Sequence, residues 1–304
     1  MFKVLIIGFG LIAHGYNANS RFSITHYNAI KKSRNFKLVA IVDKKRIKLR
    51  NYPYYKDYNT AIKFHKPDLI VLSVPTSSQY KILKKLAQYD KVKIILCEKP
   101  FTKNYLQSKK IKKLFENSKV KIFINYMRNV DYILEDKINN YFQLKKKNNF
   151  TSGFVFYNGT PLNFASHYIS LLIKYFGKVI NIKFLENKKK NNFILKFKKA
   201  KFTFFSNKQL FNSYERLEIL NADYFLSYNN GGESLEIRRL GINPIYKKKI
   251  FFKKIDFQKN KFYKNCQKYI YKELYKYLKK KKCSLPSMDI GISVHKILNF
   301  LKRE

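Results

Sequence analysis

The sequence contains no tryptophan, only three cysteines and few acidic residues. The three cysteines are too few and too scattered for a disulfide framework; they are Cys97, Cys266 and Cys283. Because there is no CxxC pair and no Cys/His cluster, the sequence predicts no metal site. It also lacks any apolar run near the roughly 18 residues that span a bilayer. We therefore expect reduced thiols, a cytoplasmic location and no membrane span.

The N-terminal apolar run is short. VLIIG follows Lys3 and is broken by glycines within a few residues, and no small-residue cleavage site of a secretory signal follows it. The run therefore indicates a strand.

The shortage of acidic residues leaves a large positive charge. Against 64 Lys and Arg there are 19 Asp and Glu, so the formal net charge is +45. A basic chain can bind nucleic acid or an anionic membrane through its phosphates. Here, however, the lysines are spread from Lys3 to Lys302 among abundant Asn, Ile, Phe and Tyr, the residues that an A/T-rich genome over-produces. We interpret the charge as compositional drift that adds non-specific anion binding at low salt.

The first half alternates apolar runs with helix-like stretches. At 304 residues and 45% hydrophobic residues, the chain is long enough for two domains with real cores. The expected strands are Val4 to Ile7, Leu38 to Val42, Leu69 to Val74, Val92 to Cys97 and Val120 to Asn125. Helix-period apolar residues lie between some of them, at 78–89 and 104–117. Runs without polar alternation are typical of a parallel sheet buried on both faces.

The pattern changes after about residue 126. One helix is expected at 163–176, followed by alternating segments that favour an antiparallel sheet with one covered face. These segments are VINIKFL, NFILKFK, KFTFFS, ERLEIL, DYFLSY and SLEIRR. A closing helix is expected at 288–302. The fold class is therefore α/β, with a parallel domain at 1–125 and an α+β domain with a mostly antiparallel open sheet at 126–304.

A glycine turn follows the first strand directly. Gly8, Phe9, Gly10, Leu11, Ile12 and Ala13 form a GxGxxA pattern. The first glycine allows a tight turn, the second lets a pyrophosphate approach the backbone, and the alanine permits close helix packing. A glycine turn without a ligand is the alternative, but a second strand ends on Asp43, whose carboxylate can accept hydrogen bonds from the adenosine ribose. Together they predict a Rossmann dinucleotide-binding domain.

The spacing to the aspartate is stretched. Asp43 lies 30 residues after Ala13, against the roughly 20 expected. We attribute the excess to a polar loop inserted at 14–25, before a helix starting near His26. Asp43 argues for NAD, whereas Lys44, Lys45 and Arg46 could hold the 2′-phosphate of NADP. In so lysine-rich a chain the basic residues carry little weight, so we expect NAD, with NADP possible.

Glu98, Lys99 and Pro100 end the fourth strand, where ligands bind in open α/β sheets. With GFGLIA they occur alongside SVPTSS, NYMR at 125–128, YNGTPLNFASHYISLLIKYFG at 157–177, and LPSMDIGISVHKIL. In these motifs the sequence resembles the Gfo/Idh/MocA family of sugar oxidoreductases over nearly its whole length. EKP and the SHY helix are the specific parts.

The resemblance implies roles for the residues at the strand ends. Lys99 would act beside the nicotinamide and the substrate hydroxyl, and Lys99-Pro100 would be a cis peptide. Glu98 would lie at the same cofactor site, and Ser73, Pro75 and Thr76 would line it on the nicotinamide side. An ammonium near the reacting C–O bond can stabilise developing alkoxide or pass a proton.

The resemblance also implies that His167 is the general acid or base on the sugar hydroxyl, a task that suits imidazole. On a regular helix of about 100° per residue, Asn163, His167, Ser170 and Lys174 share one polar face, opposite a stripe that includes Phe164. A solvated face would give the same pattern. Many family members carry aspartates where this chain has Asn163 and Ser170, so we expect Asn163 to hydrogen-bond the substrate.

Arg128 is expected at the entrance to the second domain. Its guanidinium could clamp a carboxylate or phosphate of the substrate, and a hinge salt bridge is the alternative.

We expect an NAD(P)-dependent oxidoreductase that moves hydride between nicotinamide and a carbinol or keto carbon of a sugar, amino sugar, sugar acid or nucleotide sugar. By resemblance, it would be a homodimer or homotetramer related to surface-polysaccharide sugar biosynthesis. Two alternatives remain at this point: a cofactor-binding protein without turnover, and a basic nucleic-acid or membrane-surface binder.

Overall fold

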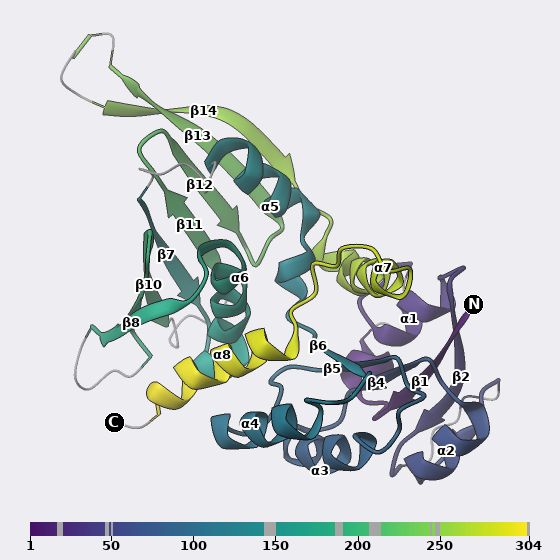
Figure 1. Ribbon diagram of the computed structural model, residues 1–304. Helices are drawn as coiled ribbons and strands as arrows, with labels where there is room; N and C mark the ends of the chain where they lie inside the picture. Colours follow the sequence, from purple (N-terminus) through teal and green to yellow (C-terminus); the bar gives the residue numbers. More distant parts are fainter. Residues whose placement is uncertain are drawn as a thin grey trace. The chain divides into compact units, whose positions relative to one another are not determined.

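The computed structural model describes residues 1–16, 21–45, 49, 51–142, 150–185, 191–206, 214–243, 245–246 and 250–302 (Figure 1). The chain forms two compact units, which are described separately below. Unit 1 comprises Met1–Val130 and Lys264–Asn299, and unit 2 comprises Asp131–Tyr263 and Phe300–Glu304.

Unit 1 is built on a six-stranded parallel sheet with the order β3-β2-β1-β4-β5-β6. Its strands are β1 (Phe2–Ile7), β2 (Phe36–Val42), β3 (Tyr54–Tyr55), β4 (Leu69–Leu72), β5 (Ile94–Cys97) and β6 (Lys121–Ile124). β4 and β5 are buried along their whole length, as strands covered on both faces must be. All five expected strands are confirmed, and β3 adds an edge that the sequence did not indicate.

Among its described residues, unit 1 has six α-helices. They are α1 (His26–Lys31), α2 (Tyr58–His65), α3 (Thr76–Leu86), α4 (Tyr105–Leu114), α7 (Cys266–Leu278) and α8 (Met288–Phe300, which belongs to unit 1 up to Asn299). The side chains of Thr25, Asp57 and Asn104 cap α1, α2 and α4 by accepting a backbone N–H three residues later. α2 and α7 were not expected, because α2 is short and α7 buries polar Gln267 and Glu273 alongside its apolar residues.

The end of the chain packs on the first sheet. Ser287 forms a bridge with Phe123, and a side chain at Gly291 would lie 2.9 Å from Ile124. On α8, His295 accepts a hydrogen bond from the backbone N–H of Thr102 at 3.2 Å. The closing helix expected at 288–302 is therefore present, but it groups with unit 1 and not with the rest of 126–304. The first boundary lies at 130/131, five residues beyond the expected one.

Unit 2 is built on an eight-stranded sheet with the order β14-β13-β12-β11-β7-β10-β9-β8. Its strands are β7 (Thr151–Tyr157), β8 (Val179–Phe184), β9 (Phe193–Phe197), β10 (Ala200–Ser206), β11 (Arg216–Leu220), β12 (Tyr224–Asn229), β13 (Ser234–Ile242) and β14 (Ile250–Lys259). β7 and β10 pair in parallel, and every other neighbouring pair is antiparallel. The mostly antiparallel sheet is thus confirmed.

One face of this sheet is covered. Phe176 of α6 (Ser166–Phe176) lies against Phe197 and Phe202, with ring centroids 5.9 and 5.0 Å away. Asp131, which caps α5 (Tyr132–Lys137), accepts a hydrogen bond from buried Tyr228. On β9, β10 and β11, burial alternates residue by residue, as a half-covered sheet requires.

Short helical turns complete the two units. They are η1 (Leu11–Gly15), η2 (Met127–Val130), η3 (Ile138–Phe142), η4 (Pro161–Ala165) and η5 (Tyr263–Asn265). No described helix is long and apolar enough to cross a membrane.

Candidate dinucleotide site

The glycine turn lies between β1 and η1 in unit 1. Gly8 has a φ of +88°, and a Cβ there would lie 2.6 Å from the carbonyl oxygen of Ser73, so only glycine fits. The Ser73 hydroxyl in turn donates to the Gly8 carbonyl oxygen at 2.5 Å. At Gly10, by contrast, a Cβ would have no neighbour within 4 Å. The turn is therefore locked to β4 at Gly8 and open at Gly10, which leaves room for a phosphate to approach the backbone.

Asp43 ties the end of β2 to this turn. Its Oδ2 accepts the backbone N–H of Phe9 at 2.7 Å, and its Oδ1 accepts that of Lys45 at 2.9 Å. The Tyr54 hydroxyl donates to the carbonyl oxygens of Asp43 and Lys45, at 2.6 and 3.0 Å. The carboxylate keeps lone pairs for the hydroxyl donors of a ribose. Lys44 and Lys45 are exposed, and Arg46 lies outside the described residues.

Part of the loop expected at 14–25 is tied to the body of unit 1. The backbone N–H of Ser23 donates to the carbonyl oxygen of Lys264. The carbonyl oxygen of Ser23 accepts from the backbone N–H of Gln267. The ammonium of Lys32 donates to the carbonyl oxygen of Phe22 at 3.2 Å. Residues 22 and 23 are therefore held to α1, η5 and α7, and 17–20 lie outside the described residues. The helix expected near His26 begins there.

Two further strand ends lie along the same sheet edge. Pro75 precedes α3, which starts at Thr76, directly after the segment that contacts Gly8. One strand further on, the N–H of Glu98 donates to the carbonyl oxygen of Leu72 at 2.9 Å. The Lys99-Pro100 peptide is cis, as the resemblance implied. Lys99 itself is partly buried.

Sequence reasoning missed the polar groups around Glu98. Oε1 of Glu98 contacts Nε2 of fully buried His26 at 2.9 Å and accepts from the Asn125 amide at 2.5 Å. The other ring nitrogen of His26 lies 3.3 Å from the Tyr271 hydroxyl, and burial raises the pKa of that hydroxyl well above its ordinary value. The NYMR motif contains Asn125, but nothing local to His26 or Tyr271 indicated this network.

Arg128 lies in η2 and is 5% exposed. It interacts electrostatically with Cys266 and partly opposes the burial that raises the pKa of that thiol to about 12. The guanidinium is therefore buried and lies near Cys266, at the start of α7.

His167 and Asn163 belong to unit 2. α6 begins at Ser166, and η4 before it is a π-helical turn, so the α-helical spacing between Asn163 and His167 does not hold. The regular helix expected from 163 thus begins at Ser166; His167, Ser170 and Lys174 lie within it, and Asn163 lies in the turn before it. His167 and Ser170 are buried, Asn163 is exposed, and Phe164, expected on the apolar stripe, is 38% exposed.

The class of protein follows from the fold and this turn. A parallel sheet with an open glycine turn at its carboxyl edge, and an aspartate on the next strand, defines an NAD-binding Rossmann domain. Residues 2–126 match the model of the Gfo/Idh/MocA oxidoreductase family, NAD-binding Rossmann fold. This match confirms the resemblance over residues 2–126, which contain the GFGLIA and EKP motifs.

Solved structures share the fold over the whole chain. A dehydrogenase (MviM) from Clostridium difficile is 16% identical with a TM-score of 0.72, covering 99% of this chain and 98% of that one. UDP-N-acetylglucosamine 3-dehydrogenase from Acidithiobacillus ferrooxidans is 12% identical with a TM-score of 0.73, covering 97% and 95%. An Agrobacterium radiobacter oxidoreductase in complex with NAD+, L-tartaric acid and magnesium is 13% identical with a TM-score of 0.68, covering 98% and 94%. No curated protein matches the chain.

Proposed function

We propose that this protein is an NAD(P)-dependent oxidoreductase that transfers hydride between nicotinamide and a carbinol or keto carbon of a sugar, amino sugar, sugar acid or nucleotide sugar. The observation that carries the proposal is the placement of a partly buried lysine, Lys99, at the carboxyl end of β5, on the same sheet edge as the open glycine turn. Among the structural neighbours, one acts on a nucleotide sugar by its name.

The cofactor contacts in the proposal follow the strand ends of unit 1. NAD is the expected cofactor, because the Asp43 carboxylate would repel the 2′-phosphate of NADP. One structural neighbour is described as NADPH-dependent, so the binding test below includes both cofactors. The proposed contact residues are Gly8, Phe9, Gly10, Leu11, Ile12, Ala13, Asp43, Lys44, Ser73, Pro75, Thr76, Glu98 and Lys99.

Bound NAD+ supplies a hydride acceptor. In the oxidative direction the carbinol C–H bond breaks and its electron pair leaves with the hydride. The hydroxyl loses its proton to a protein base, so a carbonyl and NADH result. We assign the handling of that proton to Lys99 and His167, since an amine and an imidazole are groups that exchange protons near neutral pH when suitably placed. Asn163 and Arg128 are assigned to substrate binding.

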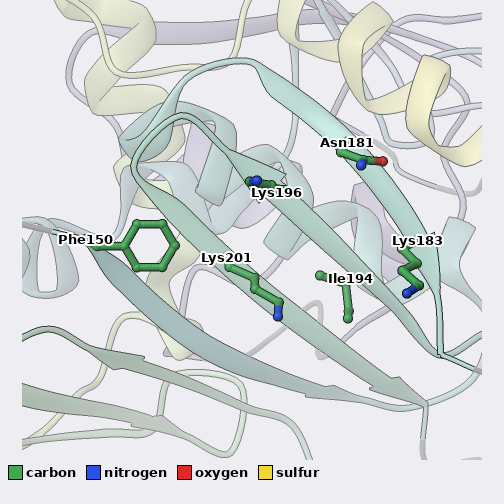
Figure 2. A pocket seen from close by; sticks show the side chains of 6 residues that line it. All are labelled: Phe150, Asn181, Lys183, Ile194, Lys196 and Lys201. Atoms are coloured by element: carbon green, nitrogen blue, oxygen red, sulfur yellow. The ribbon is translucent and has the colours of Figure 1, made fainter.

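The same proposal holds that the protein is cytoplasmic and forms a homodimer or homotetramer. The outer face of the unit 2 sheet carries stacked aromatic rings: Phe205 lies 5.5 Å from Phe156 and 6.2 Å from Phe154. Beside them is a hollow of about 400 Å³ on β8, β9 and β10 (Figure 2). Its lining consists of Phe150, Asn181, Lys183, Ile194, Lys196 and Lys201. Exposed aromatic side chains gathered on one sheet face are typical of a protein interface, and we propose that a second copy of the chain covers this face.

The first test is cofactor binding. Wild-type protein and Asp43→Ala are heated in buffer, with NADH and with NADPH. Saturation at a hundredfold excess over Kd should stabilise the wild-type protein by about 2.7 kcal/mol. Asp43→Ala should reduce the NADH shift. No shift with either cofactor would overturn the proposal.

The second test is turnover. NAD+ reduction is followed by absorbance with a panel of sugars, sugar acids and nucleotide sugars. Lys99→Ala should keep most of the cofactor-induced thermal shift, because the other proposed contact residues remain, and should lower kcat by about a hundredfold or more. Lys103→Ala, an exposed lysine on the same loop, is the matched control and should keep full activity. Unchanged turnover in Lys99→Ala would remove Lys99 from the chemistry.

A further inference from the structure

One buried side-chain amide holds the backbone of residues 98–100, directly after β5. Gln79, on α3, is 1% exposed. Its Nε2 donates to the carbonyl oxygen of Glu98 at 3.1 Å and to that of Pro100 at 3.3 Å. These two carbonyls flank Lys99 on either side. A single side chain thus fixes the backbone both before and after the lysine.

The orientation of this amide is determined by its contacts. Among the residues that the structure describes, the Oε1 atom of Gln79 has no hydrogen-bond partner. If the amide were flipped, its oxygen would face two carbonyl oxygens, which repel it. Both donor hydrogens are therefore committed to the Lys99 segment.

The preceding side chain is held as firmly. The Glu98 carboxylate is fixed by His26 at 2.9 Å and by Asn125 at 2.5 Å, from α1 and from the end of β6. Asn125 also donates to Gln267 on α7 at 3.3 Å. The segment is therefore anchored by groups from α1, α3 and β6, all within unit 1. Such support of a reactive group by neighbouring packed side chains limits its range of positions.

We propose that Gln79, together with the His26–Glu98 pair, positions Lys99 for reaction. The inference rests on the proposed function, because the reaction meant is the proton transfer proposed above. The hydrogen bonds from Gln79 to the carbonyl oxygens of Glu98 and Pro100, called the clamp below, lie within unit 1. Gln79 acts through the backbone and contacts neither reacting atom. Its removal releases the two carbonyls, so Lys99 samples positions that are unproductive for proton transfer.

The test uses the reactivity of the Lys99 amine. Wild-type protein, Gln79→Met and the control Gln88→Met are labelled with limiting acetic anhydride without cofactor or substrate. Mass spectrometry of peptides then gives the labelling rate of Lys99 relative to exposed Lys103 of the same loop. Methionine keeps the length of glutamine and removes only its donors and acceptor. Gln88 is exposed and lies just beyond α3.

Gln79→Met should change the Lys99 to Lys103 ratio by about threefold or more, since burial and neighbours set amine reactivity. Gln88→Met should not change it. In turnover, Gln79→Met should lower kcat by about tenfold with an unchanged KM for NAD+. If Gln79→Met does not fold, Gln79→Leu replaces it. An unchanged Lys99 to Lys103 labelling ratio in the folded variant would overturn the proposal that Gln79 positions Lys99, whatever the turnover assays show. A changed ratio in a protein without turnover would support the clamp and overturn the proposed function alone.

Discussion

Gly8 and Gly10 stand two residues apart in one turn, yet their surroundings differ. Gly8 has a positive φ and a backbone carbonyl pressed against it, so its role is to let β1 turn beside β4. Gly10 has an ordinary φ of −79° and open space where a side chain would be. Its role must come from something that occupies this space, and a pyrophosphate is the group that the motif accommodates.

Alanine substitutions should separate the two roles. Gly8→Ala should lower the free energy of unfolding by about 1–3 kcal/mol, from the strained backbone alone. Gly10→Ala should change it by less than about 0.5 kcal/mol, because its Cβ has no close neighbour. Gly10→Ala should nevertheless abolish most of the thermal shift caused by NADH. Urea unfolding and thermal shifts measure both effects. A normal NADH shift in Gly10→Ala would place the pyrophosphate elsewhere.

At the scale of elements, two helices of unit 1 begin with equivalent caps of different chemistry. Asp57 accepts the N–H of Thr60 at 2.9 Å at the start of α2, and Asn104 accepts that of Gln107 at 2.9 Å at the start of α4. Hydrogen bonds from Thr60 hold the pKa of the Asp57 carboxyl below its ordinary value. Only the Asp57 cap can therefore depend on pH.

Removing each cap should cost about 1 kcal/mol of stability near neutral pH. Because the pKa of Asp57 is lower in the folded state, its contribution is present above the unfolded pKa and is lost as pH falls through the folded value. The effect of Asp57→Ala should thus shrink between about pH 5 and pH 2. The effect of Asn104→Ala should stay constant. Denaturant unfolding across this range measures both, and a constant effect for Asp57→Ala would show that the carboxylate charge is unimportant.

At the scale of the whole molecule, the proposed self-association depends on the outer face of the unit 2 sheet. Phe154 is 44% exposed and pairs with Thr203 and Glu218 on its neighbouring strands. Phe154→Lys places an ammonium beside Glu218, which the sheet itself tolerates, and charges the surface that a second copy would cover. The sheet should remain folded while its outer face loses apolar area.

Phe154→Lys should therefore convert an oligomer to a monomer in analytical ultracentrifugation, with little change in the unfolding of the protomer. Phe64→Lys is the matched control, because Phe64 is 76% exposed on α2 in unit 1. A monomeric wild-type protein, or an unchanged mass in Phe154→Lys, would contradict the proposed interface.

Local signals predicted much of this chain. Continuous apolar runs predicted every strand of the first sheet except β3, because burial on both faces leaves no polar positions. Strands with one covered face were found where the alternation was clean, as in β9 and β11. β7 was missed because Phe154 and Phe156 make its outer face apolar as well. α7 was missed because it buries glutamine and glutamate, which find partners only in the folded chain.

The sequence by itself determined the glycine turn, Asp43, the EKP segment and the two kinds of sheet, because each depends on neighbours in the chain or on a simple period. Tertiary structure decided the rest. Glu98 contacts His26 across 72 residues of sequence, Gln79 reaches both sides of Lys99, and α8 joins the first unit. These contacts are fixed by packing between distant segments, and no local pattern encodes which buried polar groups will meet.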